Sequence, residues 1–204
     1  MTNQDISSIK SMNKNKIILD LCGGTGAWSK PYKDNGYDVR NITLPDYDVR
    51  TYKPPENVYG ILSAPPCTYF SLARTRAKTP RDFRKGMELV IICLKIIWEC
   101  RYDNPLKFWV LENPTGYLRQ FLGKPFFTFH PYEYGDPYTK KTDLWGYFNI
   151  PKKKPIKLTK EQIARCKINA CRLPSISDFT GSKQSSRRSI TPGGFAKAFF
   201  GANI

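Results

Sequence analysis

Acidic residues, histidine and paired cysteines are all scarce in this 204-residue sequence. Only 17 Asp and Glu stand against 33 Lys and Arg, which gives a formal net charge of +16. The single histidine, His130, excludes most catalytic arrangements built on a histidine base unless it is placed for that role. The six cysteines include no C-x-x-C pair. Because structural zinc normally uses closely spaced Cys and His ligands, we expect no metal site.

Long apolar segments are also missing. No run approaches the roughly 18 apolar residues that a transmembrane helix needs. The first residues, MTNQDISSIKSMNKNK, are polar and lack the apolar core of a secretory signal. Unpaired cysteines fit a reducing compartment. We therefore expect a cytoplasmic protein without a membrane partner, in a bacterial or phage-infected host cell.

The excess of positive charge is concentrated in two segments. Residues 72–85 hold six Lys and Arg with one Asp, and residues 151–188 hold eleven Lys and Arg with two acids. Clustered cations favour a polyanionic partner because each neutralised phosphate releases counterions. A solvated face that only aids solubility is the alternative. The charge pattern thus indicates nucleic acid as a partner.

Apolar runs that read as strands alternate with helical or mixed segments. Strands are predicted at 17–21, 37–44, 58–63, 108–111 and 144–148, and a deeply packed helix at 82–102. This alternation is typical of an α/β fold, with a mostly parallel twisted sheet and helices on both faces. The length of the chain suits one domain over residues 1–204.

A glycine-rich turn follows the first predicted strand, in the sequence ILDLCGGTGAWS at 18–29. Glycines let the backbone approach a cofactor closely at the carboxyl edge of a sheet. A dinucleotide-binding enzyme would instead need G-x-G-x-x-G and an acid at the end of the next strand. Here Ser29 takes the sixth position and the second strand ends in Thr43-Leu44-Pro45. The turn therefore favours a cofactor site of another kind, or a tight turn without a ligand.

A cysteine follows the third predicted strand, in the sequence APPCTYFS at 64–71. Two prolines hold the backbone extended and fix the place of Cys67. A thiol there can act as a nucleophile if nearby cations favour the thiolate, and Arg74 and Arg76 follow closely. The alternative is a small buried apolar residue.

An acid ends the next strand, in the sequence VLENPTG at 110–116. If both strands belong to one parallel sheet, Glu112 lies beside the same cleft as Cys67. A partly desolvated Glu could be kept protonated and donate a hydrogen bond. An acid that only caps a turn is the competing interpretation.

The order of these three motifs resembles the cytosine carbon-5 DNA methyltransferase family. The resemblance implies a Rossmann-like fold that binds S-adenosyl-L-methionine. It also implies that residues 189–204 form a final helix that returns to the cofactor site. By the same resemblance, the cofactor-binding positions are Asp20, Cys22, Gly23, Gly24, Gly26, Ala27, Trp28, Asp48, Val49 and Pro65.

The family's chemistry assigns a covalent nucleophile to Cys67 and stabilisation of the cytosine ring to Glu112. The resemblance further implies that the substrate is held by Pro66, Asn113, Arg74, Arg76 and Lys141. Lys141 stands in for the first arginine of a strand that the family uses for a cationic contact. The expected reaction is methyl transfer to carbon-5 of cytosine in DNA, as in restriction-modification systems.

The sequence departs from the family between its last strand and its final helix. Residues 149–188 form a short basic insert where a full target-recognition domain would normally lie. Three alternatives follow: the same chemistry on RNA or a cytosine nucleotide, a protein partner that supplies sequence recognition, or a nucleic-acid-binding subunit without catalysis.

Overall fold

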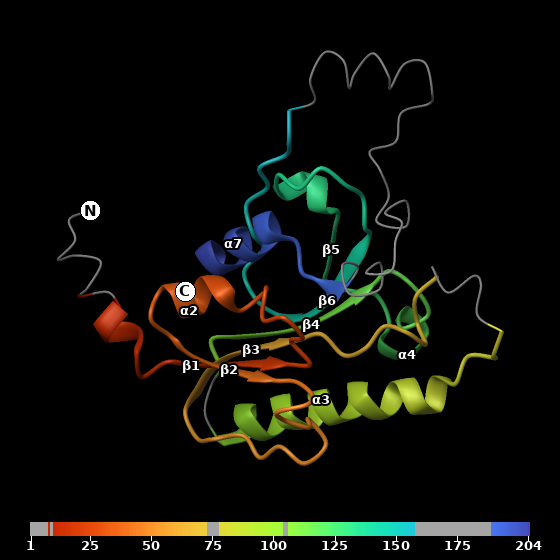
Figure 1. Cartoon of the computed structure of the whole chain (residues 1–204), viewed down its shortest axis with the longest axis horizontal. Helices are drawn as coiled ribbons and strands as arrows, with labels where there is room; N and C mark the ends of the chain where they lie inside the picture. The colour runs from red at the N-terminus through yellow and green to blue at the C-terminus, as the bar shows by residue number, and fades with distance from the viewer. Residues whose placement is uncertain (1–7, 9, 73–77, 104–105, 158–188) are drawn as a thin grey trace.

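The computed structural model describes residues 8, 10–72, 78–103, 106–157 and 189–204 (Figure 1). It is an α/β protein, as predicted, in which helices flank a sheet that is mixed and has six strands. The strands are β1 (Ile17–Leu21), β2 (Asp38–Ile42), β3 (Val58–Ser63), β4 (Phe108–Pro114), β5 (Phe127–Phe129) and β6 (Thr142–Tyr147). The helices are α2 (Lys30–Asp34), α3 (Phe83–Asp103), α4 (Arg119–Leu122), η1 (Pro131–Tyr134) and α7 (Gly193–Ala202).

The sheet is less parallel than predicted. Its strand order is β2-β1-β3-β4-β6-β5, and the pairings among β1, β2, β3 and β4 are parallel. β6 runs antiparallel to both β4 and β5. β5 and β6 are consecutive strands joined through η1, without the long crossover that parallel neighbours need. β6 therefore lies between β5 and β4 and runs in the opposite direction to both.

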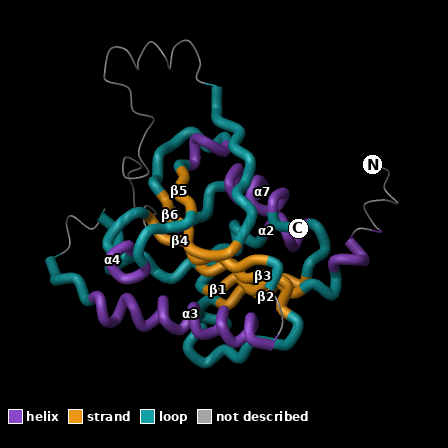
Figure 2. Tube along the Cα trace, turned by 180° about the vertical axis from the view of Figure 1, so that it is seen from behind, coloured by secondary structure: helices purple, strands orange, loops and turns teal. Residues whose placement is uncertain are grey.

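Side chains alternate between the two faces of the sheet, and each face has its own helices. Leu19 and Ile61 pack with α3 on one face. Ile18 and Leu62 pack on the other face, against α2 and α7. Figure 2 shows α3 on the side opposite α2 and α7. Both faces of the central strands are therefore covered, which explains their continuous apolar sequences.

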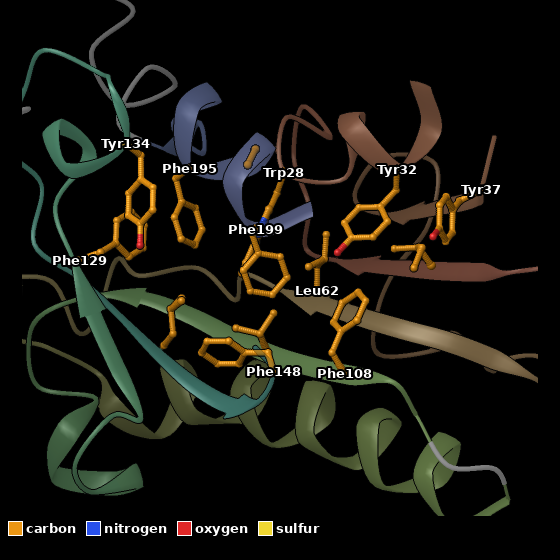
Figure 3. Close-up of a cluster of buried hydrophobic side chains, with 14 residues drawn as sticks. Trp28, Tyr32, Tyr37, Leu62, Phe108, Phe129, Tyr134, Phe148, Phe195 and Phe199 are labelled. Carbon is orange, nitrogen blue, oxygen red and sulfur yellow. The ribbon is translucent and has the colours of Figure 1, made fainter. Parts of the chain in front are cut away.

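Aromatic side chains fill the core between the sheet and the helices α2 and α7 (Figure 3). Trp28 packs against Phe195 and Phe199 of α7, with ring centroids 6.0 and 5.5 Å apart. Phe129 of β5 stacks on Phe195 with centroids 3.8 Å apart. These contacts tie the C-terminal helix to the segment that follows the glycine-rich turn.

Candidate active site

The three sequence motifs meet at one edge of the sheet. β1, β3 and β4 are parallel and adjacent, so their carboxyl ends lie side by side. The Ala64 amide, just past β3, donates to the Leu21 carbonyl at the end of β1 (2.9 Å). The glycine-rich turn, the Cys67 loop and Glu112 thus converge where α/β proteins commonly bind ligands.

The glycine-rich turn uses backbone conformations that glycine favours. Gly24 and Gly26 have φ of 54° and 69°, and the Gly26 amide donates to the Gly23 carbonyl (2.9 Å). Cys22, which is not a glycine, has φ of 56°. A Cβ at Gly23 would lie 2.3 Å from Cγ of Asp20. Only glycine at position 23 therefore allows the turn to pack this closely against Asp20.

Asp20 is fully buried beneath this turn. The Ser29 hydroxyl donates to Oδ2 of Asp20 (2.5 Å), whereas Oδ1 has no hydrogen-bond partner among the described residues. Burial raises the pKa of Asp20 to about 6, against an ordinary 3.8. A buried acceptor without a partner is costly. This position suits a ligand that brings a hydrogen-bond donor.

Asn41 of β2 is a second unsatisfied group at the turn, which the sequence did not single out. Its Nδ2 donates to the Gly24 carbonyl (3.0 Å), and its Oδ1 lacks a partner within the described part of the chain. A Cβ on Gly23 would lie 2.5 Å from this oxygen and 2.5 Å from Oδ1 of Asp20. Two acceptors thus gather at the same glycine.

Two predicted cofactor residues are core residues in the structure. The Trp28 side chain is only 2% exposed and lies among the aromatic rings of α7. The Val49 side chain is buried in the cluster on the α3 face. Both can reach a ligand at this edge only through the backbone. Ala27, beside Trp28, is half-buried.

Two more of the predicted cofactor residues, Asp48 and Cys22, have side chains near the turn. Asp48 forms an ion pair with Arg50, and this partner lowers the pKa of the Asp48 carboxyl. Cys22 packs toward Cys93 of α3, which together with burial raises the pKa of its thiol. The negative charge of Asp48 raises it further.

The Cys67 loop is held in place by Asn113 of β4. Asn113 is buried, and its Nδ2 donates to the carbonyl of Pro65 (3.0 Å), which is also buried. Pro66 is exposed and Cys67 is half-buried, with its carbonyl accepting from the amides of Phe70 and Ser71. Asn113 therefore links the two motifs directly.

Glu112 forms an ion pair with a lysine that the sequence did not identify. Nζ of Lys140 lies 3.6 Å from Oε1 of Glu112, and the two side chains are only 9% and 14% exposed. The amide of Thr115 donates to the carbonyl of Lys141 (2.9 Å), which fixes residues 140–141 beside the end of β4. Lys141 itself is exposed. Lys140 is thus the cation that reaches the carboxylate.

Opposing effects act on the Cys67 thiol. Burial and then the charge of Glu112 raise its pKa, while Lys140 lowers it, and the net shift is upward. The thiol, the carboxylate and the ammonium are therefore close enough to influence one another. The predicted cations Arg74 and Arg76 lie outside the described residues.

No protein-family model matches the chain, and no curated protein matches it. In the described part of the chain, every helix is too short or too polar to cross a membrane. Function is therefore inferred from the residues at this edge of the sheet.

Proposed function

We propose that this protein transfers a methyl group from S-adenosylmethionine to carbon-5 of cytosine in DNA, on a Rossmann-like methyltransferase fold. The observation that carries the proposal is the cluster of Cys67, Glu112 and Lys140 at the carboxyl ends of adjacent strands. The glycine-rich turn ends the neighbouring strand. The site thus combines a nucleophile, an acid and a neighbouring glycine-rich turn that can hold a cofactor.

The residues at the glycine-rich turn fit the cofactor. S-adenosylmethionine carries an ammonium group and ribose hydroxyls, which are hydrogen-bond donors, and the unpartnered oxygens of Asp20 and Asn41 lie buried directly beneath the turn. Gly23, Gly24 and Gly26 leave the backbone open to close approach. When bound, the cofactor supplies an electrophilic methyl group to a nucleophilic carbon.

Carbon-5 of cytosine is a poor nucleophile, and Cys67 overcomes this difficulty. The thiol passes its proton to Glu112, and the thiolate adds to carbon-6, so that electron density moves onto carbon-5. Through that proton Glu112 donates a hydrogen bond to N3, and its other oxygen accepts one from the exocyclic amino group, where charge develops. After methylation, the carbon-5 proton leaves to a solvent base, and the electron pair expels the Cys67 thiolate and restores the ring.

The neighbouring residues hold these groups in place. Asn113 fixes the Cys67 loop through Pro65, while Lys140 fixes the Glu112 carboxylate and contributes positive charge beside the thiol. Pro66 is exposed next to Cys67 and can contact the base. In duplex DNA the base must first leave the stack, which costs a few kcal/mol.

A trapping experiment tests the covalent step. The full chain is incubated with S-adenosylmethionine and duplex DNA that carries 5-fluorocytosine, in which fluorine replaces the proton that must leave carbon-5. Because fluorine cannot leave as a cation, elimination stops and the protein remains attached to DNA. We expect a denaturant-stable complex for the wild type and none for Cys67→Ser. A complex that forms equally with Cys67→Ser would refute the role of Cys67.

A further inference from the structure

Residues 130–157 carry more positive charge than their own acids neutralise. This segment contains six lysines and three acids. Each acid is already engaged: Glu133 with Lys153, Asp136 with the amide of Gly194, and Asp143 with Arg119. Lys140 is paired with Glu112. The remaining lysines form what we call the lysine surface: Lys141, Lys152, Lys154 and Lys157, all exposed and without an acidic partner among the described residues.

The backbone under the lysine surface is fixed. The amide of Lys154 donates to the Glu133 carbonyl (2.9 Å), and the amide of Ile156 donates to the Tyr132 carbonyl (3.1 Å). Pro151 is buried, and its carbonyl accepts from the Tyr134 hydroxyl. Figure 1 shows residues 150–157, in cyan, passing beside η1. The lysines therefore project from an anchored segment.

The lysine surface is continuous with the candidate active site. Lys141 follows Lys140, the partner of Glu112. Lys141 and Lys153 both lie close enough to His130 to lower its pKa, in addition to the larger effect of burial. The His130 ring stacks on Tyr132, whose carbonyl anchors the lysine segment. Lys141 and the lysines at 152–157 are thus connected through His130 and Tyr132.

We propose that the lysine surface binds the phosphodiester backbone of DNA and that the substrate is a polymer. This inference rests on the proposed function for the choice of DNA. Several unneutralised cations along one anchored segment match a repeating anion, whereas a free nucleotide offers one phosphate group. Backbone contacts position a protein on DNA and release counterions, so they add affinity and salt dependence.

The test is binding of a fluorescent 20-base-pair duplex, measured by anisotropy across a salt series. The variant is Lys152→Gln/Lys154→Gln/Lys157→Gln in the full chain. The control, Lys14→Gln/Lys53→Gln/Lys107→Gln, removes the same charge from exposed residues that precede β1, β3 and β4, at the opposite edge of the sheet. Thermal unfolding confirms that both variants fold.

We expect the lysine-surface variant to bind about tenfold more weakly or worse. The slope of log K against log salt should fall in magnitude by about 2 to 3, close to 0.9 per lost contact. The control should bind within about twofold of the wild type. Equal losses in both variants would overturn the proposal, because only net charge would then matter.

Two further arms separate the possible failures. Loss of RNA binding with unchanged DNA binding would overturn the choice of DNA. Methyl transfer to duplex DNA and to free dCMP is measured in the same variant. We expect transfer to duplex DNA to fall, and efficient transfer to dCMP by the wild type would overturn the claim that the substrate is a polymer. If the lysine-surface variant binds DNA more weakly than the control but no methyl transfer is detected, the result supports the lysine surface and refutes the proposed function.

Discussion

At the residue scale, Cys67, Glu112 and Lys140 form a charge-coupled group. The pKa of the thiol is raised by burial and by Glu112, and Lys140 opposes both effects. The thiolate is therefore not the resting form at neutral pH. A substrate that neutralises Glu112 through hydrogen bonds, or a further cation that approaches Cys67, would make the thiolate easier to form.

This balance predicts the pH dependence of methyl transfer. Activity that needs the thiolate rises with pH, and a raised thiol pKa moves that rise to higher pH. Lys140→Met should raise the pKa of Cys67 further and lower kcat/KM at pH 7.5 by roughly a hundredfold, the lower end of the range for loss of one charge-stabilising contact in an active site. The measurement is kcat/KM from pH 6.5 to 9.5.

Lys141→Met is the matched control for that prediction, since it removes an adjacent but exposed ammonium. Its pH profile should keep the shape of the wild-type profile, whatever its effect on substrate affinity. Identical upward shifts in both variants would contradict the assignment of Lys140 as the cation beside Cys67.

Asp20 predicts a stability effect. Its pKa is about 6 in the folded protein and near 3.8 when exposed, so the folded state binds more protons between these values. Its contribution to the free energy of unfolding therefore falls by about 2 kcal/mol as pH rises from 4.5 to 7.5. Asp20→Asn should remove that fall, and denaturant unfolding at pH 4.5 and 7.5 measures it. An unchanged difference between the two pH values would refute the effect.

Several site residues could be predicted from the sequence because the motif itself places them. Cys67 comes shortly after β3 and Glu112 lies near the end of β4, so the buried strands fix their location. Lys140 and Asn41 could not be predicted, because their positions depend on the register of β6 against β4 and of β2 against β1. One residue of register separates Lys140 from Lys141 and decides which lysine meets Glu112.

At the element scale, the loop that carries Cys67 and the loop that follows β4 are held together at the edge of the sheet that forms the candidate active site. Ser71 and Gly116 form an isolated antiparallel bridge, and the amide of Tyr117 donates to the Phe70 carbonyl (3.0 Å). The buried Asp143 binds Arg119 and also accepts from Thr115, which follows β4. The loops that carry Cys67 and Glu112 are therefore held by backbone pairing and by an ion pair.

At Gly116, the close contact between these two loops leaves no room for a side chain. A Cβ there would lie 2.3 Å from the Phe70 carbonyl oxygen, which is backbone. Gly116→Ala should separate the two loops, destabilise the protein by about 1–3 kcal/mol and reduce methyl transfer by more than the loss of folded protein explains. Urea unfolding and activity per folded molecule measure the two effects.

Gly193→Ala is its control, because a Cβ at Gly193 meets no atom within 4 Å. We expect stability within about 0.5 kcal/mol of the wild type and full activity. A Gly116→Ala protein as stable and active as Gly193→Ala would contradict the role of the loop contact.

The sequence predicted the central elements better than those at the β5 and β6 side of the sheet. β1 and β3 have the predicted bounds, and α3 is shifted by one residue from the predicted 82–102. β5 was not predicted because a strand of three residues is too short to show an alternation of apolar and polar side chains. The composition of β6 does not indicate that it runs antiparallel to its neighbours. The C-terminal helix starts at Gly193 rather than 189, after Pro192.

At the scale of the whole molecule, the hydrophobic core and the candidate active site occupy different parts of the fold. Two hydrophobic clusters cover opposite faces of the sheet and leave its carboxyl edge for the glycine-rich turn, Cys67 and Glu112. The lysine surface adjoins that edge through Lys141, which follows the Glu112 partner Lys140. Part of the predicted basic insert, residues 158–188, lies outside the described residues. The proposed backbone contacts thus lie on the same α/β fold as the candidate active site.

The most direct test is transfer of a tritiated methyl group from S-adenosylmethionine to duplex DNA, single-stranded DNA, RNA and dCMP. Wild type, Cys67→Ala and the buried-thiol control Cys100→Ala are compared, with cofactor binding measured in parallel. We predict 5-methylcytosine in DNA for the wild type and Cys100→Ala, and loss of label by at least about a thousandfold for Cys67→Ala with cofactor affinity retained. Undiminished transfer by Cys67→Ala, or no label on any substrate while cofactor is bound, would contradict the account.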